Sequence, residues 1–167
     1  MAIGLFLLSG CNSSSQSESS TDNIKESSVI TEVPSSESVG KWDVYSREGI
    51  DPFITMGIEY PSYKIVFKIQ KNSYHSKASA EMRVMQKTEN GFKSIPEGSY
   101  NIKIGNMTAF SSSEVINIPE NDIEKFIEVL EKGDFTITLT NEKTPVVYDF
   151  SITNQTKGVS EAWAQIQ

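Results

Sequence analysis

Alternating apolar and polar residues dominate the middle of the chain and predict β-strands. Between residues 63 and 70, large apolar side chains recur at every second position, and a similar run covers 80–84 after a polar link. Alternation with a period of two buries one face of a strand and leaves the other in water. Further runs of this kind lie at 100–104, 135–139 and 146–152. Short polar links between successive runs predict antiparallel neighbours.

Two other segments have apolar residues three and four positions apart, which predicts amphipathic helices. The stripe of the first consists of Ile123, Phe126, Ile127 and Leu130. Asn121 and Glu124 have the spacing of a capping box, and Gly133 suits the end of this helix. A shorter helix beginning near Ser160 has the stripe Val159, Ala162, Trp163 and Ile166. We therefore expect an α+β domain over residues 41–167, with a mainly antiparallel sheet or small sandwich of five to seven strands covered by two amphipathic helices.

The single cysteine, Cys11, stands directly after a short apolar run. One thiol forms neither an intramolecular disulfide nor a structural zinc site, which leaves an incidental thiol, a nucleophile or a covalent attachment point. Leu8-Ser9-Gly10-Cys11 resembles the lipobox of bacterial lipoproteins. The resemblance implies that a signal peptidase cuts after the motif Leu8, Ser9 and Gly10, and that Cys11 becomes a lipid-bearing N-terminus. Residues 1–10 would then be the remnant of a signal peptide, and because no Lys or Arg precedes the apolar run, we expect the true start upstream of Met1.

Residues 11–40 are rich in serine and acidic side chains and poor in large apolar ones. Such a composition buries too little apolar surface to offset the entropy of ordering, so the segment is predicted to be a disordered tether. The rest of the chain lacks an apolar run of 18 residues, so the sequence predicts no spanning helix. We expect attachment to the cell membrane through lipid on Cys11, with the domain on the extracytoplasmic side. Such tethers are typical of Gram-positive surfaces, although the sequence is also compatible with an outer membrane.

Composition and charge exclude several kinds of chemistry. The net charge of −7 gives no reason to expect a nucleic-acid partner. His75 is the only histidine, so any nucleophile–base pair or multi-histidine metal site would depend on it. The acidic residues between positions 120 and 131 follow the polar face of the predicted helix. We expect neither catalytic residues, nor a metal, nor a cofactor.

The segment 49–63 combines aromatic and apolar residues with two prolines and two glycines, and it is the least regular part of the domain. Aromatic side chains favour binding surfaces, and irregular apolar loops on a rigid sheet are plausible contact sites. Aromatic residues are also common in strands, where core packing is the alternative explanation. The hypothesis is an exposed patch for a protein partner, formed by Phe53, Ile54, Met56 and Tyr60.

The order of elements suggests a family. Trp42-Asp43-Val44 opens the domain, Pro96-Glu97-Gly98 precedes a strand, and a helix ending in Lys132-Gly133 is followed by two strands and Gly158-Val159-Ser160. As a loose template this pattern resembles the invasion-associated locus B family of exported bacterial proteins. The resemblance implies a non-enzymatic, envelope-associated protein and supplies no catalytic residues.

Two classes of function follow from the sequence. The first is a membrane-anchored bacterial surface lipoprotein whose domain is a non-catalytic binding module for an unidentified protein. The second is an extracytoplasmic small-ligand carrier or enzyme with a pocket between helices and sheet. A deep pocket with convergent polar groups would favour the second, and a shallow sheet with exposed aromatic residues the first.

Overall fold

The computed structural model describes residues 28–36, 40–72, 77–96, 98–111 and 114–167. The strands are β1 (Ser28–Glu32), β2 (Asp43–Arg47), β3 (Ile50–Glu59), β4 (Tyr63–Asn72), β5 (Lys77–Thr88), β6 (Gly91–Ser94), β7 (Tyr100–Ile104), β8 (Met107–Ser111), β9 (Val115–Ile118), β10 (Asp134–Asn141) and β11 (Val146–Thr153). A 3-10 turn (Glu120–Asp122) leads into α1 (Ile123–Lys132), and α2 (Val159–Ala164) follows β11. The five alternating runs of the sequence correspond to β4, β5, β7, β10 and β11, which confirms them as strands.

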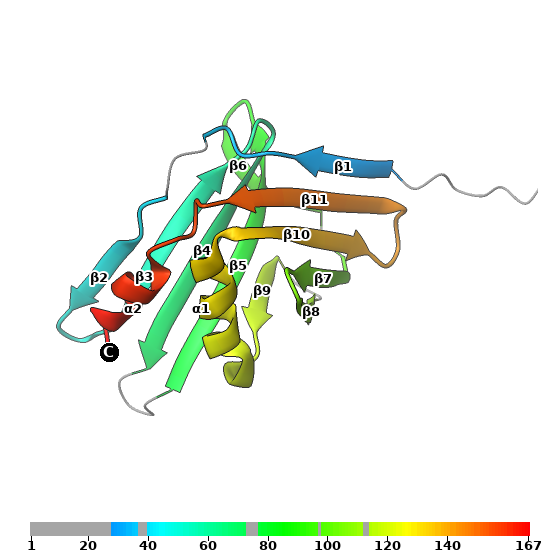
Figure 1. Cartoon of the computed structure of the whole chain (residues 1–167). Helices are drawn as coiled ribbons and strands as arrows, with labels where there is room; N and C mark the ends of the chain where they lie inside the picture. The colour runs from blue at the N-terminus through cyan, green and yellow to red at the C-terminus, as the bar shows by residue number, and fades with distance from the viewer. Residues whose placement is uncertain (1–27, 37–39, 73–76, 97, 112–113) are drawn as a thin grey trace, which may run out of the picture.

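The described strands form two sheets. The first has the order β1-β11-β10-β7-β8, and the second has the order β2-β3-β4-β5-β6 with β9 also paired to β5. Neighbouring strands are antiparallel except for β1 and β11, which are parallel. Figure 1 shows the long strands β3, β4 and β5 running across the direction of β10 and β11. The sheets therefore cover one another over part of their area.

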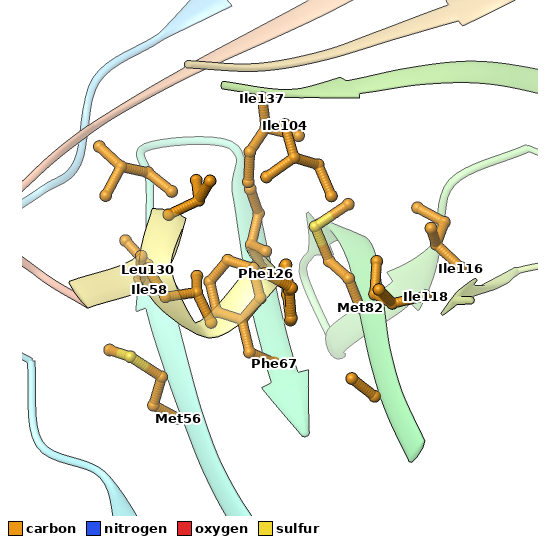
Figure 2. Close-up of a cluster of buried hydrophobic side chains, with 14 of the residues drawn as sticks. Met56, Ile58, Phe67, Met82, Ile104, Ile116, Ile118, Phe126, Leu130 and Ile137 are labelled. Atoms are coloured by element: carbon orange, nitrogen blue, oxygen red, sulfur yellow. The ribbon is translucent and has the colours of Figure 1, made fainter. Parts of the chain in front are cut away.

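One face of the second sheet is buried by two different neighbours. Tyr63 of β4 packs edge-on against Phe150 of β11, with ring centroids 5.5 Å apart. Further along β4, the ring of Phe67 lies 6.1 Å from that of Phe126 in α1. Figure 2 shows these two rings at the centre of a cluster that also receives Ile104 and Ile137 from the first sheet. The core is continuous from the sheet–sheet contact to the contact between sheet and helix.

The expectation of an α+β domain covered by two amphipathic helices is wrong. The structure is mostly β-sheet, and α2 spans only six residues. Val159, Ala162 and Ile166 are buried as the stripe predicted, but the helix ends at Ala164, before Ile166. Because the two sheets bury much of each other's inner surface, one helix of ten residues is enough to cover the remainder.

Of the two ends predicted for α1, the C-terminal one is confirmed and the N-terminal one differs. Gly133 adopts the left-handed conformation with a φ of 68°, which confirms it as the helix stop. The capping box is wrong, since Asp122 is the N-cap and its side chain makes no capping hydrogen bond. The preceding 3-10 turn, whose Asp122 backbone N–H donates to the carbonyl of Pro119 at 2.8 Å, organises this end instead.

Most of the segment read as an irregular loop is strand β3, which pairs with β2 on one side and β4 on the other. Gly57 and Pro52 do not break β3, because each occupies a position of the strand that tolerates its residue type. Gly57 lies on the outward face beneath Lys64, where an added Cβ would come within 2.8 Å of the lysine Cε. Pro52 lies at a shift of register, between the pairs Tyr45–Phe53 and Arg47–Ile50, where the β2–β3 ladder is already interrupted.

Part of the predicted tether belongs to the fold. Residues Ser28–Glu32 form β1, which pairs with β11 in the register Ser28–Val146 to Glu32–Phe150. Further on, the backbone N–H of Ser35 donates to the carbonyl of Glu59 at 2.8 Å. The folded part of the chain therefore begins before residue 41. The predicted signal remnant and the tether up to residue 27 lie outside the described residues.

Candidate functional site

The expected exposed patch at Phe53, Ile54, Met56 and Tyr60 does not form. The exposed fraction is 0% for Ile54, 3% for Met56 and 2% for Tyr60, so these three side chains belong to the core. Phe53 is only half-buried and faces the opposite side of β3. The reason is the strand period: positions 54, 56 and 58 point inward, so position 53 points outward.

Phe53 has an outward-facing partner that the sequence hypothesis did not include. Tyr45 of β2 lies directly opposite it, and the two rings stack with centroids 4.7 Å apart and planes 15° apart. The Nζ of Lys68 on β4 lies 4.9 Å from the centre of the Phe53 ring. Tyr45 keeps 49% of its surface exposed. We call Tyr45, Phe53 and Lys68 the aromatic patch.

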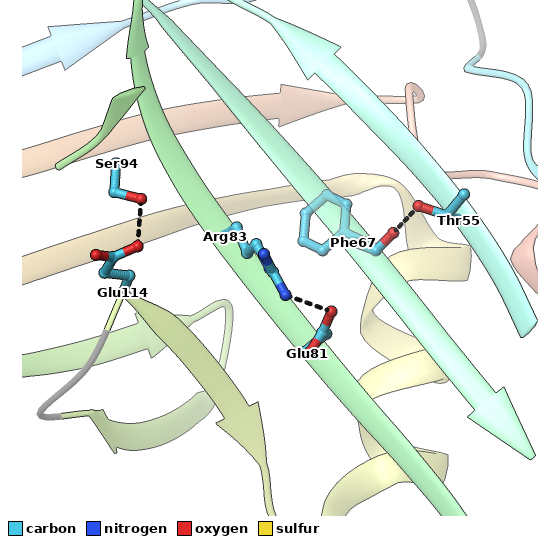
Figure 3. A network of polar contacts seen from close by, with 6 residues as sticks. All are labelled: Thr55, Phe67, Glu81, Arg83, Ser94 and Glu114. Atoms are coloured by element: carbon cyan, nitrogen blue, oxygen red, sulfur yellow. Dashed lines mark hydrogen bonds and ion pairs between the residues drawn. The ribbon is translucent and has the colours of Figure 1, made fainter. Parts of the chain in front are cut away.

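The rest of the outward face of the second sheet is a mixed polar surface, part of which is drawn in Figure 3. Arg83 and Glu81 form an ion pair at 3.3 Å on β5, and Lys64 pairs with Glu59 at 3.2 Å. Lys64 also lies 5.4 Å from the ring centre of Phe92. One partner of each pair is more than half exposed, at 58% for Glu59 and 52% for Arg83, and ion pairs at such surface sites add little stability. Neither helix covers this face, because both pack on the inner side of the sheet.

The position of the aromatic patch is fixed by a buried polar junction next to β2. The indole Nε1 of Trp42 donates to the carbonyl of Thr156 at 2.9 Å, and the Thr156 hydroxyl donates to the carbonyl of Leu130 at 2.6 Å. Gln155 Nε2 donates to the carbonyl of Ser36 at 3.0 Å. We call Trp42, Gln155, Thr156 and these acceptors the polar junction. It joins the chain before β2 to the end of α1 and to the loop after β11, and sequence reasoning missed it because its members are far apart in the chain.

A hydrogen bond between the two helices organises the far side of this junction. The backbone N–H of Ser160 donates to Glu131 Oε2 at 2.9 Å, so a side chain of α1 caps the first turn of α2. The backbone N–H groups of Ser160 and Gly158 lower the pKa of Glu131, since hydrogen bonds to the carboxylate favour its ionised form. Gly158, with a φ of 87°, lets the chain turn sharply into α2. No signal in the sequence pairs Glu131 with Ser160.

The tyrosines of the core have a structural role. Burial raises the pKa of Tyr60, and the charge of Glu32 adds to this effect. The hydroxyl of Tyr60 donates to the carbonyl of Ser151 at 3.2 Å. Burial likewise raises the pKa of Tyr63 and of Tyr148, whose rings lie 5.8 Å apart. The hydroxyl of Tyr60 thus joins the end of β3 to β11, and the rings of Tyr63 and Tyr148 pack against one another between the two sheets.

A hollow lies between α1, α2 and the ends of β4 and β5. Its volume is about 450 Å³, and its apolar lining includes Ile123, Ile127 and Trp163. At its rim the ion pair between Lys77 and Glu120 spans 3.1 Å, with 60% and 52% of the two side chains exposed. We call it the helix groove. Its polar groups are exposed at the rim and do not converge on one point.

Several residues singled out in the sequence lie outside the part of the chain that the structure describes. Cys11, the motif Leu8, Ser9 and Gly10, and His75 lie outside the described residues. Within the described part of the chain, no three His, Cys, Asp or Glu side chains are arranged to hold a metal ion. None of the helices found in the described ranges has the length and apolar character needed to cross a bilayer.

Comparison with known proteins gives no relative for this chain. No family model matches it, and neither a curated protein nor a solved structure does so. The resemblances to bacterial lipoproteins and to the invasion-associated locus B family therefore stay predictions that rest on the residues alone.

Proposed function

We propose that the protein is a lipid-anchored surface module of a bacterial cell, and that it binds a protein partner through the outward face of its second sheet. The observation that carries the binding half is the aromatic patch. Two stacked aromatic rings and a lysine ammonium stand on a sheet face that neither helix covers. The proposed role is non-catalytic.

The chemistry of the aromatic patch suits protein recognition. Tyrosine and phenylalanine offer large contact areas while losing little conformational entropy, because each has two rotatable side-chain bonds. Here the stacking of Tyr45 on Phe53 restricts both rings before a partner arrives. Lys68 adds a positive charge at the edge of the apolar area. The partner that fits is a protein surface with an apolar centre and a carboxylate near it.

The anchoring half rests on the N-terminal sequence. The run Leu8-Ser9-Gly10-Cys11 supplies the cleavage pattern and the thiol. Lipoprotein processing leaves two or three acyl chains at such a cysteine, which is enough for stable membrane attachment. Residues 12–27 then provide length between the lipid and β1. In this arrangement the domain stands away from the membrane surface.

The helix groove supports a second candidate function, a carrier for a small ligand. Its volume of about 450 Å³ is within the range of ligand sites, and Trp163 offers a flat apolar wall. The carrier function is the less favoured of the two, because the ion pair at the rim is exposed and the polar groups of the helix groove are scattered. Quenching of the Trp163 fluorescence by a panel of small amphipathic compounds, compared with a Trp163→Phe variant, tests this alternative.

The anchor is tested by metabolic labelling with an alkyne fatty acid in an expressing bacterium. We expect label on the protein, recovery in the membrane fraction and a mass that corresponds to cleavage before Cys11. The Cys11→Ala variant should lose the label and the cleavage. An unlabelled wild-type chain in the soluble fraction would remove the anchoring half of the proposal.

The binding face is tested by a photo-crosslinking amino acid placed at Gln70, which lies opposite Phe53 on β4. This site leaves the aromatic patch intact. The control position is Thr140, an exposed residue of β10 in the other sheet. We expect a defined light-dependent adduct with another cellular protein at Gln70 and none at Thr140. Equal adducts at both positions, or none at Gln70, would contradict the proposed face.

A further inference from the structure

The second sheet ends in an edge strand, β2, whose outer side has no neighbour among the described strands. All five of its residues are exposed. An edge of this kind carries backbone N–H and C=O groups that can pair with another strand. We propose that β2 pairs in antiparallel fashion with β2 of a second copy of this chain, about a two-fold axis that passes between the two Tyr45 residues.

The strand is regular enough to act as such an edge. From Tyr45 to Arg47 the chain advances two residues on β2, while the paired positions on β3 advance three, from Ile50 to Phe53. The extra residue of the bulge therefore belongs to β3. The outer side of β2 keeps an uninterrupted extended course, and the irregularity lies on the inner side of the pairing.

The side chains of β2 select one register. Opposed residues of antiparallel strands point to the same face of a sheet, whereas successive residues of one strand point to opposite faces. The two-fold axis must therefore pass through a residue position, because an axis between two residues would oppose side chains that belong to different faces. An axis at Asp43 or at Arg47 would set that charge against itself. An axis at Val44 would set Lys41 against Arg47.

An axis at Tyr45 has the opposite effect. It places Asp43 of each copy opposite Arg47 of the other, so the contact contains two complementary charge pairs. An axis at Ser46 makes no charge pair at all. The order Asp43-Val44-Tyr45-Ser46-Arg47 is thus self-complementary in this register alone. This pattern is the reason for choosing a second copy, and not an unrelated extended peptide, as the occupant.

The same register extends the aromatic patch. Opposed Cβ atoms in antiparallel strands lie roughly 4.5–5.5 Å apart, so Tyr45 would face its counterpart directly. Each Tyr45 already stacks on its own Phe53, next to Lys68. The dimer would join both patches into one surface that crosses the axis. A pairing of five residues per strand is small, so we expect a reversible dimer.

Purified chain in a Cys11→Ala background tests the register through disulfide trapping. Tyr45→Cys should form a disulfide-linked dimer under mild oxidation, because only the residue on the axis faces its own copy. Ile50→Cys is the matched control, since Ile50 is as exposed as Tyr45 but lies one strand away from the edge. Asp43→Cys and Arg47→Cys should each stay unlinked alone and link to one another when mixed. Equal linking of Tyr45→Cys and Ile50→Cys would overturn the proposal.

Sedimentation velocity of charge variants, in the same Cys11→Ala background, tests the same contact without introduced cysteines. Asp43→Arg and Arg47→Asp should each weaken dimerisation by roughly tenfold, because each turns both attractive pairs into repulsive ones. The double variant should return within about twofold of wild type. A wild-type chain that stays monomeric, or a dimer that all variants retain equally, would overturn the proposal. Either result leaves the anchor and the Gln70 adduct untouched, so the two proposals fail separately.

Discussion

Trp42 and Tyr45 are three residues apart, yet they belong to regions with opposite properties. Trp42 lies in the polar junction, where its indole N–H donates to the carbonyl of Thr156 at 2.9 Å and the residue is only 8% exposed. Tyr45 stands on the edge strand, half-exposed, and its ring stacks on that of Phe53. In the junction each described buried side-chain polar atom has a hydrogen-bond partner. On the edge strand the outer backbone groups have none among the described strands.

The difference separates groups that hold the fold from groups that are available to a partner. A buried polar atom that loses its partner costs free energy of unfolding, so changes in the junction should be felt as instability. Exposed aromatic groups contribute less to stability, so changes on the face should leave the fold intact. Each of the following variants contrasts the two regions, in order of the effect expected on stability.

The strongest contrast is between two neighbouring residues of β3. Ile54→Ala should lower the free energy of unfolding by about 2–5 kcal/mol, because it leaves a cavity in the core. Phe53→Ala, on the outward face, should lower it by about 1 kcal/mol or less. Denaturation in urea, monitored by circular dichroism, measures both. Similar losses for the two variants would show that β3 does not divide core from surface in this way.

The polar junction should give the next largest effect. Thr156→Val keeps the shape of the side chain but removes the donor to the carbonyl of Leu130, which is left buried without it. We expect a loss of about 1–3 kcal/mol. The exposed Thr140→Val, in β10, is the matched control and should change stability by less than about 0.5 kcal/mol. Thermal unfolding of Thr156→Val and Thr140→Val measures both losses. Equal losses would show that removing any threonine hydroxyl has this effect, and that the polar junction has no special role.

Glu131 adds a pH dependence to this side of the comparison. Glu131→Gln should cost about 1 kcal/mol near neutral pH, since the caps of α2 lose a charged acceptor. The folded pKa of Glu131 is lowered, so its contribution is fully present above the ordinary glutamate pKa and is lost as the pH falls through the folded value.

Unfolding measured between pH 7 and pH 3 should therefore show the wild-type and Glu131→Gln curves converging in acid. Glu128→Gln, one turn away on the exposed face of α1, should run parallel to wild type. A constant gap between wild type and Glu131→Gln across this range would contradict the assigned cap.

Lys68 should give the smallest change in stability. Its ammonium lies over the Phe53 ring at a partly exposed site, where such contacts contribute about 0.5–1 kcal/mol. Lys68→Met should cost no more than this, and Lys68→Arg should restore most of it. The same two variants show whether partner binding needs the positive charge at position 68, because Lys68→Arg keeps this charge and Lys68→Met removes it.

The sequence predicted those elements in which one periodicity persists. β4 and β10 alternate without interruption, and the stripe of α1 ends at a glycine, so both kinds of element could be recognised. β3 was missed because Pro52 and Gly57 obscured the alternation of Ile54, Met56 and Ile58. Read as a strand, this run would have placed Phe53 outward.

The polar junction was beyond sequence reasoning for a different reason. Its hydrogen bonds join residues 114 and 119 positions apart, and the sequence carries no local sign of such contacts. Similarly, β1 was assigned to the tether because the surrounding residues 11–40 are rich in serine and acidic side chains. It is ordered by pairing with β11, which depends on the tertiary fold. The stacking of Tyr45 on Phe53 needed the register of a hairpin that had not been recognised.

The most direct test of the account is the yield of the Gln70 photo-adduct in the Phe53→Ala variant, normalised to the amount of folded protein in the membrane. The account predicts that this variant keeps a stable fold and membrane attachment but loses most of the adduct. The Thr140→Val variant should keep it. An undiminished adduct in a folded Phe53→Ala protein would contradict the assignment of the aromatic patch as the binding surface.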